Sequence, residues 1–290
     1  MSKTTAHVWA LFCIVIWGSS FVLTTVLMES LTPAKLVFYR FLIGYLVVLL
    51  AYPKQEKMEL KDRLGMLLFG FIGVTVYYLC ESYALKYTYA ANVSILVTFA
   101  PLITVFLSRL FNKNERISRR FILGSTIALL GVALVIFNGK VVLKLNPLGD
   151  LLALGAAVCW SVYSLLLRHY AKRYSEMFLS RQILFNGCIT LLPLAIFDSG
   201  PWNLLALAEP LNLFSLLLLG ALASGICYVL WNVANVKIGI VAANAYVYVS
   251  PFVTLVAAYL FLKQPVTLMS LFGCILIIGG VAIYEGALYK

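Results

Sequence analysis

The sequence has few charged residues for its length. Only 11% of its 290 residues are Asp, Glu, Lys or Arg, whereas a soluble domain carries about 25%. Hydrophobic residues make up 63% of the chain, and the mean hydropathy is +0.98. So few charges cannot cover a surface that faces water. The composition therefore predicts an integral membrane protein.

Metal-binding and disulfide patterns are also missing. The chain has two histidines, and its six cysteines lie singly within apolar runs, without a CxxC pair. This arrangement predicts neither a zinc site nor a disulfide framework. We interpret the cysteines as small apolar packing residues, and we expect no metal and no cofactor.

Long apolar runs dominate instead. A membrane β-barrel would show alternating segments of about 10 residues, but here the runs are about 20 residues long, enough to cross ~30 Å of hydrocarbon as helix. The first run is too long for a secretory signal peptide, so we keep it as a span. Ten spans are predicted: 8–28, 34–52, 64–84, 90–111, 119–137, 148–168, 177–197, 212–234, 240–262 and 267–286.

The net charge of +11 indicates orientation in the membrane rather than nucleic-acid binding. With the N-terminus in the cytoplasm, the inner loops and tails hold fifteen Lys and Arg residues and the outer loops hold five. Because cytoplasmic loops are enriched in basic residues, we expect both termini on the cytoplasmic side.

An internal repeat organises the chain. Residues 70–111 align without a gap to residues 220–261, with eight identities that include Tyr78/Tyr228 and Pro101/Pro251. Two similar halves of five spans each must enter the membrane from opposite sides. The sequence therefore predicts an all-α fold of two inverted five-helix repeats, 1–140 and 146–290, an architecture typical of alternating access.

Glycines and prolines recur at matching places. Gly124 and Gly131 are seven residues apart, as are Gly273 and Gly280, so each pair places notches on one helix face and predicts close helix packing. A hinge is the alternative. The two prolines each remove a hydrogen bond within a span and predict a kink.

Glu81 is the one acidic residue well inside a span. Tyr77 and Tyr78 share its helix face at spacings of four and three. A partly desolvated carboxyl could carry a proton or meet a substrate ammonium. Alternatively, Glu81 lies at the helix end as a solvated partner of Lys86.

Further polar and aromatic residues are candidates for a substrate cavity. Trp17 and Trp160 occupy corresponding places early in each half, with packing or anchoring as an equal alternative. Tyr228, Trp231 and Asn232 follow one helical stripe, with Trp231 in the place that Glu81 holds in the other half. The remaining candidates are Asn92 and Asn244. Arg40 is expected to pair with a carbonyl or a carboxylate, and Arg181 to extend toward water.

Several of these motifs are similar to a known family. The segments Trp17-Gly18-Ser19-Ser20-Phe21 and Tyr83-Ala84-Leu85-Lys86-Tyr87-Thr88, with Pro101 and Pro251 before a basic loop, resemble the EamA family of the drug/metabolite transporter superfamily. Gln264 departs from the Glu that members often carry there. The resemblance implies secondary transport, commonly export of amino acids or related metabolites from the bacterial cytoplasm, through a central cavity.

We therefore expect a multi-pass protein of the bacterial inner membrane that carries a small metabolite, with protons as a possible coupling ion and no nucleic-acid partner. An intramembrane lipid-modifying enzyme is the main alternative. It is disfavoured because the sequence shows no HExxH motif, acidic metal cluster or phosphate loop. A passive channel is a third option, which the aromatic-rich spans disfavour.

Overall fold

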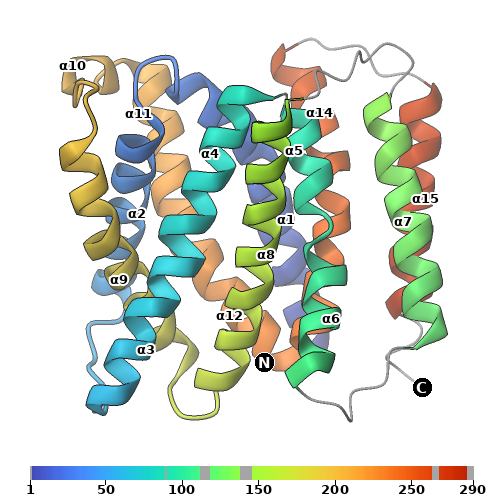
Figure 1. Ribbon diagram of the computed structural model, residues 1–290, viewed down its shortest axis with the longest axis horizontal. Coiled ribbons are helices and arrows are strands. Elements are labelled where there is room, and N and C mark those ends of the chain that lie inside the picture. The colour runs from blue at the N-terminus through green and yellow to red at the C-terminus, as the bar shows by residue number, and fades with distance from the viewer. Residues whose placement is uncertain (1, 89, 112–117, 138–145, 263–267, 286–290) are drawn as a thin grey trace.

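The computed structural model describes residues 2–88, 90–111, 118–137, 146–262 and 268–285, and these residues form a bundle of helices without a strand (Figure 1). The elements are α1 (Lys3–Leu27), α2 (Pro33–Ala51), α3 (Leu60–Gly70), η1 (Phe71–Val76), α4 (Tyr77–Tyr87), α5 (Ala90–Val97), α6 (Ala100–Phe111), α7 (Arg119–Phe137), α8 (Pro147–Tyr170), α9 (Glu176–Phe197), α10 (Leu204–Leu207), α11 (Pro210–Leu217), η2 (Leu218–Ile226), α12 (Cys227–Ile238), α13 (Ile240–Ala245), η3 (Tyr246–Val249), α14 (Ser250–Leu262) and α15 (Leu268–Glu285).

Six helical runs are long and apolar enough to cross a membrane, namely Lys3–Leu27, Pro33–Ala51, Leu60–Tyr87, Pro147–Tyr170, Glu176–Phe197 and Pro210–Ile238. Shorter apolar helices cover Ala100–Leu110, Ile240–Thr254 and Leu271–Ile283. A helix satisfies its own backbone hydrogen bonds, which hydrocarbon requires. These runs agree with the helical membrane class that the composition predicts.

Two of the long runs contain a π-helical segment. In the run Leu60–Tyr87, η1 joins α3 to α4, and in the run Pro210–Ile238, η2 joins α11 to α12. Residues 71–76 of η1 correspond to residues 221–226 of η2 at the sequence shift of 150. π-Turns are rare and often occur at functional sites, so their matching positions direct attention to the helices that follow them.

Both prolines of the repeat lie where a helix is interrupted. α5 ends at Val97 and α6 begins at Ala100, just before Pro101. Likewise, η3 separates α13 from α14, and α14 begins at Ser250, just before Pro251. Each proline thus stands in the first turn of an α-helical segment, where proline is favoured. The predicted kinks correspond to an interruption between α5 and α6 and to the 3₁₀ turn within the helical stretch Ile240–Thr254.

Local signals set other helix ends. The Asn146 side chain accepts from the N–H groups of Leu148 and Gly149 at the start of α8, and Ser175 caps α9 in the same way. These side chains satisfy N–H groups that lack a partner within the helix. Gly239, at φ +90°, ends α12 and allows α13 to begin directly.

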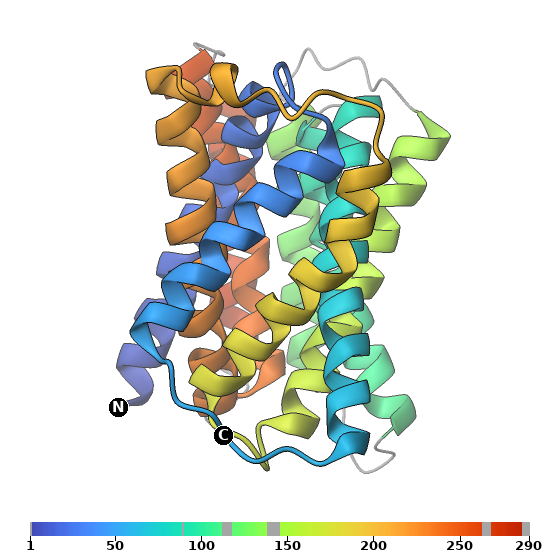
Figure 2. The same cartoon turned by 90° about the vertical axis from the view of Figure 1, so that its left-hand side faces the viewer.

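α7 and α15 pack side by side at one flank of the bundle (Figure 1). A β-carbon added to Gly131 would lie 2.5 Å from the Gly273 carbonyl oxygen, and one added to Gly280 would lie 2.5 Å from that of Gly124. The four glycines therefore mark the contact between the two helices, as the close-packing prediction requires. At the opposite flank, α2 and α9 lie side by side (Figure 2).

Candidate functional site

Aromatic rings from α1, α4, α8 and α12 meet in the middle of the bundle. We call this the aromatic cluster, and its members are Trp17, Tyr77, Tyr78, Trp160, Tyr163, Tyr228 and Trp231. Trp17 lies 5.3 Å from Trp160 and 5.1 Å from Trp231, measured between ring centroids. These separations are typical of edge-to-face and tilted aromatic contacts.

A cavity of ≈ 40 Å³ opens against this cluster. It is lined by Ile14, Trp17, Ser20, Phe21, Arg40, Tyr77, Tyr78, Glu81, Val97, Trp160, Val247 and Ser250. The volume holds only a few water molecules, each of which needs about 10–15 Å³ of such space. In this conformation the cavity is therefore too small for a metabolite.

Glu81 faces the cavity and is buried. Its side chain is 4% exposed, and its Oε2 atom accepts a hydrogen bond of 2.8 Å from the Tyr77 hydroxyl. The alternative placement, as a solvated partner of Lys86, is not what the structure shows, because Glu81 is buried whereas Lys86 is exposed. Glu81 is thus a buried carboxylate with one hydrogen-bond donor and an adjoining space.

Arg40 on α2 is a cavity residue that was not among the site candidates. It is 1% exposed, its guanidinium carbon lies 4.5 Å from the Tyr78 ring centroid, and its Nε atom donates to the Ser224 hydroxyl over 2.6 Å. The hydrogen-bond partner of Nε is a hydroxyl, and the Glu81 carboxylate that the prediction allows as a partner lines the same cavity. A signal was available in the sequence, since a cation six residues inside an apolar span requires a polar neighbour.

Two asparagines hold the helices beneath the cluster. Asn244 accepts from the Trp160 indole over 2.8 Å and donates to Ser164 over 3.0 Å. Asn232 accepts from the Tyr163 hydroxyl and donates to Ser180 over 2.9 Å. Both amides are fully buried, and their partners lie on α8 and α9. They orient the cluster rather than line the cavity.

The cluster also contacts the two π-helical segments. Trp17 donates from its indole nitrogen to the Ala223 carbonyl in η2 over 2.8 Å. Tyr228 donates to the Gly73 carbonyl in η1 over 3.0 Å. π-Turns present carbonyls that an α-helix would bond internally. By contrast, the indole nitrogen of Trp231 is buried without a hydrogen-bond partner.

The structure brings together nine of the ten candidate residues, either in the cluster or directly beneath it: Trp17, Tyr77, Tyr78, Glu81, Trp160, Tyr228, Trp231, Asn232 and Asn244. The tenth, Asn92, belongs to α5, and its side chain lies outside the described part of the structure. Their proximity defines a candidate site but does not test substrate binding.

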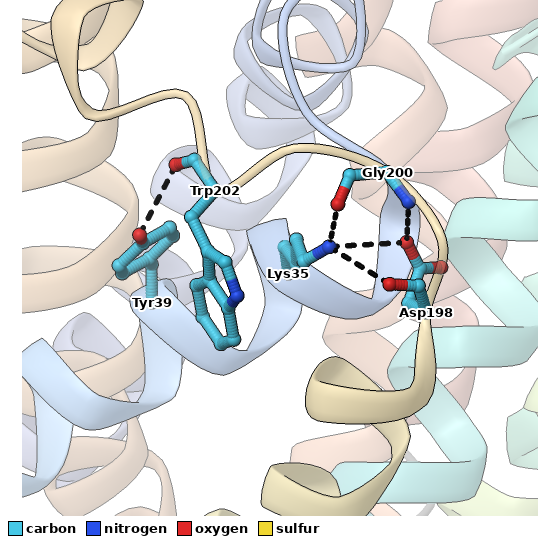
Figure 3. A network of polar contacts seen from close by, with 5 residues as sticks. All are labelled: Lys35, Tyr39, Asp198, Gly200 and Trp202. Carbon is cyan, nitrogen blue, oxygen red and sulfur yellow. Dashed lines mark hydrogen bonds and ion pairs between the residues drawn. The ribbon is translucent and has the colours of Figure 1, made fainter.

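Contacts at the end of the bundle away from the N-terminus join α2 to the segment after α9 (Figures 2 and 3). Lys35 is 1% exposed, and its ammonium donates to the carbonyls of Asp198 (3.0 Å) and Gly200 and lies 3.5 Å from the Asp198 carboxylate. It also lies 5.2 Å from the Trp202 ring. We call these residues the Lys35 contact set.

A corresponding set joins α9 to the segment after α2. Ser175 at the start of α9 contacts the Glu56 carboxylate through its hydroxyl and its N–H. Arg181, 2% exposed, donates to the Tyr52 carbonyl over 2.9 Å and to Gln55 over 2.8 Å. Arg181 is therefore buried, and the prediction that it extends toward water is wrong. We call these residues the Arg181 contact set.

Comparison with known proteins identifies relatives along the whole chain. The model of the EamA-like transporter family matches residues 4–137 and, separately, residues 147–285. The "uncharacterized transporter YdfC" of Bacillus subtilis (strain 168) is 32% identical, over 92% of this chain and 86% of its own length. The "probable terminal-alkyne amino-acid exporter" of Streptantibioticus cattleyicolor is 27% identical, over 96% and 93%. A crystal structure with 22% identity matches 98% of this chain and 99% of its own with a TM-score of 0.78, which indicates a shared fold.

Proposed function

The chain belongs to the EamA-like transporter family, and on that premise we propose that it exports small zwitterionic metabolites, such as amino acids, across the bacterial inner membrane. The S. cattleyicolor relative named as a probable amino-acid exporter supports this class of substrate and this direction. The observation that carries the proposal is a pair of opposite charges, Arg40 and Glu81, in one buried cavity.

Arg40 and Glu81 would bind the two charged groups of a zwitterion. A guanidinium donates to a carboxylate in a strong, charge-assisted geometry, and the Glu81 carboxylate would accept from the ammonium. The faces of Tyr77, Tyr78 and Trp160 border the same space, where they can hold an apolar side chain or a cation. Buried charges of both signs inside a membrane bundle are otherwise expensive.

The proposed mechanism is alternating access by two inverted five-helix repeats. Three features support it: the family model matches the chain twice, η1 corresponds to η2, and the Gly131–Gly273 approach has a counterpart in Gly280–Gly124. Two halves related by an axis in the membrane plane can exchange an opening on one side for an opening on the other.

The small cavity fits a closed state of such a cycle. Both the Lys35 and the Arg181 contact sets are formed. The Lys35 set joins the start of α2 to the segment after α9, and the Arg181 set joins the start of α9 to the segment after α2. We propose that one set separates in each open state, so that the cavity enlarges toward one side. The end that carries the termini would be cytoplasmic, as the loop charges indicate.

Reconstituted liposomes test the proposal. The protein is placed in vesicles, and flux is measured for labelled zwitterionic amino acids, their uncharged N-acetyl amides and a neutral sugar. We expect flux for the zwitterions and a loss of about tenfold in Arg40→Gln, because a charge-assisted hydrogen bond is lost. Size-exclusion chromatography establishes that the variant is folded.

Exposed Glu29 supplies the matched control, since Glu29→Gln removes a charge outside the cavity and is expected to leave flux unchanged. Equal flux in Arg40→Gln and wild type, or flux for the sugar alone, would contradict the proposed substrate class.

A further inference from the structure

A second, larger cavity lies one helical turn beyond the hydrogen-bonded asparagines. Its volume is ≈ 390 Å³, ten times that of the central cavity and within the range of ~300–1,000 Å³ typical of small-molecule sites. It is lined by the C-terminal end of α8 and by the junction of α12 with α13, where Gly239 adopts its positive φ. We call it the α8–α12 pocket.

The charge of this pocket has one sign. Arg168 and Lys172 line it, and no acidic residue is among its lining side chains in the described part of the chain. Arg168 also donates to Ser108 over 3.2 Å, which holds it in place at the pocket wall. Two cations on a largely apolar lining favour an anionic group.

A buried acceptor without a partner gives independent support. Asn235 lines the same pocket and is 2% exposed, and its Oδ1 atom has no hydrogen-bond partner among the residues that the structure describes. Its amide orientation is fixed, because Nδ2 donates to the Trp231 carbonyl over 2.9 Å. An unpaired buried acceptor is unfavourable, so this oxygen is suited to a donor supplied from outside the chain.

The pocket leads toward the central site. Asn235 is one helical turn from Trp231, and Leu167 in the pocket wall is one turn from Ser164, the partner of Asn244. Along α8, the Ser164–Asn244 hydrogen bond therefore lies between Trp160, which lines the central cavity, and Leu167.

We propose that the α8–α12 pocket is a second binding site, which takes a small carboxylate with an adjacent N–H donor before it reaches the central cavity. Arg168 and Lys172 bind the carboxylate, and the Asn235 oxygen accepts from the donor. The order of binding rests on the proposed transport function. The site itself does not, since a ligand can bind here without being carried.

Thiol labelling tests this site without knowledge of the natural substrate. Ala171→Cys places a thiol in the pocket wall, and its reaction rates with an anionic and a cationic methanethiosulfonate of similar size are compared. N-acetylglycine, a carboxylate with an adjacent N–H, is expected to slow labelling, while neutral N-acetylglycinamide leaves it unchanged. Unsubstituted protein gives the background from the native cysteines.

Matched variants separate a built site from surface charge. In the Ala171→Cys background, Lys172→Gln and Asn235→Leu are each expected to weaken N-acetylglycine protection about fivefold. Lys237→Gln removes an exposed cation from the same end of α12 that does not line the pocket, and protection is expected to persist.

Three outcomes would overturn the proposal: no protection by N-acetylglycine, equal effects of Lys237→Gln and Lys172→Gln, or protection by added phosphatidylglycerol vesicles in place of N-acetylglycine. The last would assign the pocket to a lipid headgroup. Protection in a protein that shows no amino-acid flux would keep the binding site and contradict only the proposed transport function.

Discussion

The hydroxyl of Tyr228 on α12 donates to the carbonyl of Gly73 in η1 over 3.0 Å, and so connects the cluster to the other half of the chain. Tyr228 is fully buried. If the Tyr228 hydroxyl is removed, the buried Gly73 carbonyl loses this hydrogen bond, and water does not replace it.

Tyr228→Phe tests that contact. Loss of one buried hydrogen bond is expected to destabilise the protein by about 1–2 kcal/mol, measured as thermal unfolding in detergent. Tyr45→Phe is the control, because the Tyr45 ring packs against Phe185 and its hydroxyl has no hydrogen bond in the described structure. Equal unfolding temperatures for the two variants would contradict a structural role of the Tyr228 hydroxyl.

Gly131→Ala is expected to disturb the α7–α15 contact. The new β-carbon would lie 2.5 Å from the Gly273 carbonyl oxygen and 2.7 Å from the Ile277 nitrogen, both backbone atoms. We expect a loss of about 1–3 kcal/mol from overpacking. Gly279→Ala on α15 has nothing within 4 Å of its added carbon and should be neutral. A stable Gly131→Ala protein would mean that the two helices can separate without loss.

Glu81→Gln tests whether the cavity carboxylate couples flux to protons. The variant keeps the side-chain volume and can still accept from the Tyr77 hydroxyl, but it cannot release a proton. We expect wild-type flux to respond to an imposed pH gradient and the variant to lose that response while remaining folded. If the gradient drives both proteins equally, Glu81 is not the proton carrier.

Lys35→Gln is expected to weaken the contacts between α2 and the segment after α9. Burial alone would raise the pKa of Asp198, but the Gly200 N–H, the Thr32 hydroxyl and the Lys35 ammonium together outweigh it and hold that pKa below its ordinary value of 3.8. A lowered pKa adds stability that is present above pH 3.8 and is lost as pH falls through the lowered value.

In Lys35→Gln the pKa of Asp198 should rise, so that acid destabilisation begins at a higher pH than in wild type. At pH 7 we expect a loss of about 2 kcal/mol, because two half-buried carbonyls also lose their donor. Unfolding temperature against pH measures both effects. Lys86→Gln, at an exposed lysine, is the control, and superimposable pH profiles of wild type and Lys35→Gln would contradict the account.

The sequence predicted those features that arise from local chemistry. Apolar runs, helix irregularities near Pro101 and Pro251 (predicted as kinks), and the facing glycines on α7 and α15 follow from backbone and packing rules that act within a few residues. The gathering of Tyr77, Tyr78 and Glu81 likewise follows from helical spacing. By contrast, Trp17 and Trp160 became site candidates only through the alignment of the two halves.

Long-range pairings were harder to predict. Arg40 is buried against η2 and α4, and Arg181 against the segment after α2. No spacing rule in the sequence encodes either contact. The π-helical segments were also missed, because an extra residue in a helical turn leaves apolar periodicity nearly unchanged over so short a run. The large α8–α12 pocket arises from a helix end at Gly239 that separates two neighbouring elements.

A π-turn contains one residue more than an α-turn, and one residue corresponds to about 100° of rotation in an α-helix. If the π-turn in η1 shifted along the helix into α4, each side chain that it passed would rotate by about 100° around the helix axis, while the two ends of the helical run stayed in place. Tyr77, Tyr78 and Glu81 follow η1 directly, as Tyr228 and Trp231 follow η2. The two wide turns therefore give this bundle a means to re-aim its central side chains without moving whole helices.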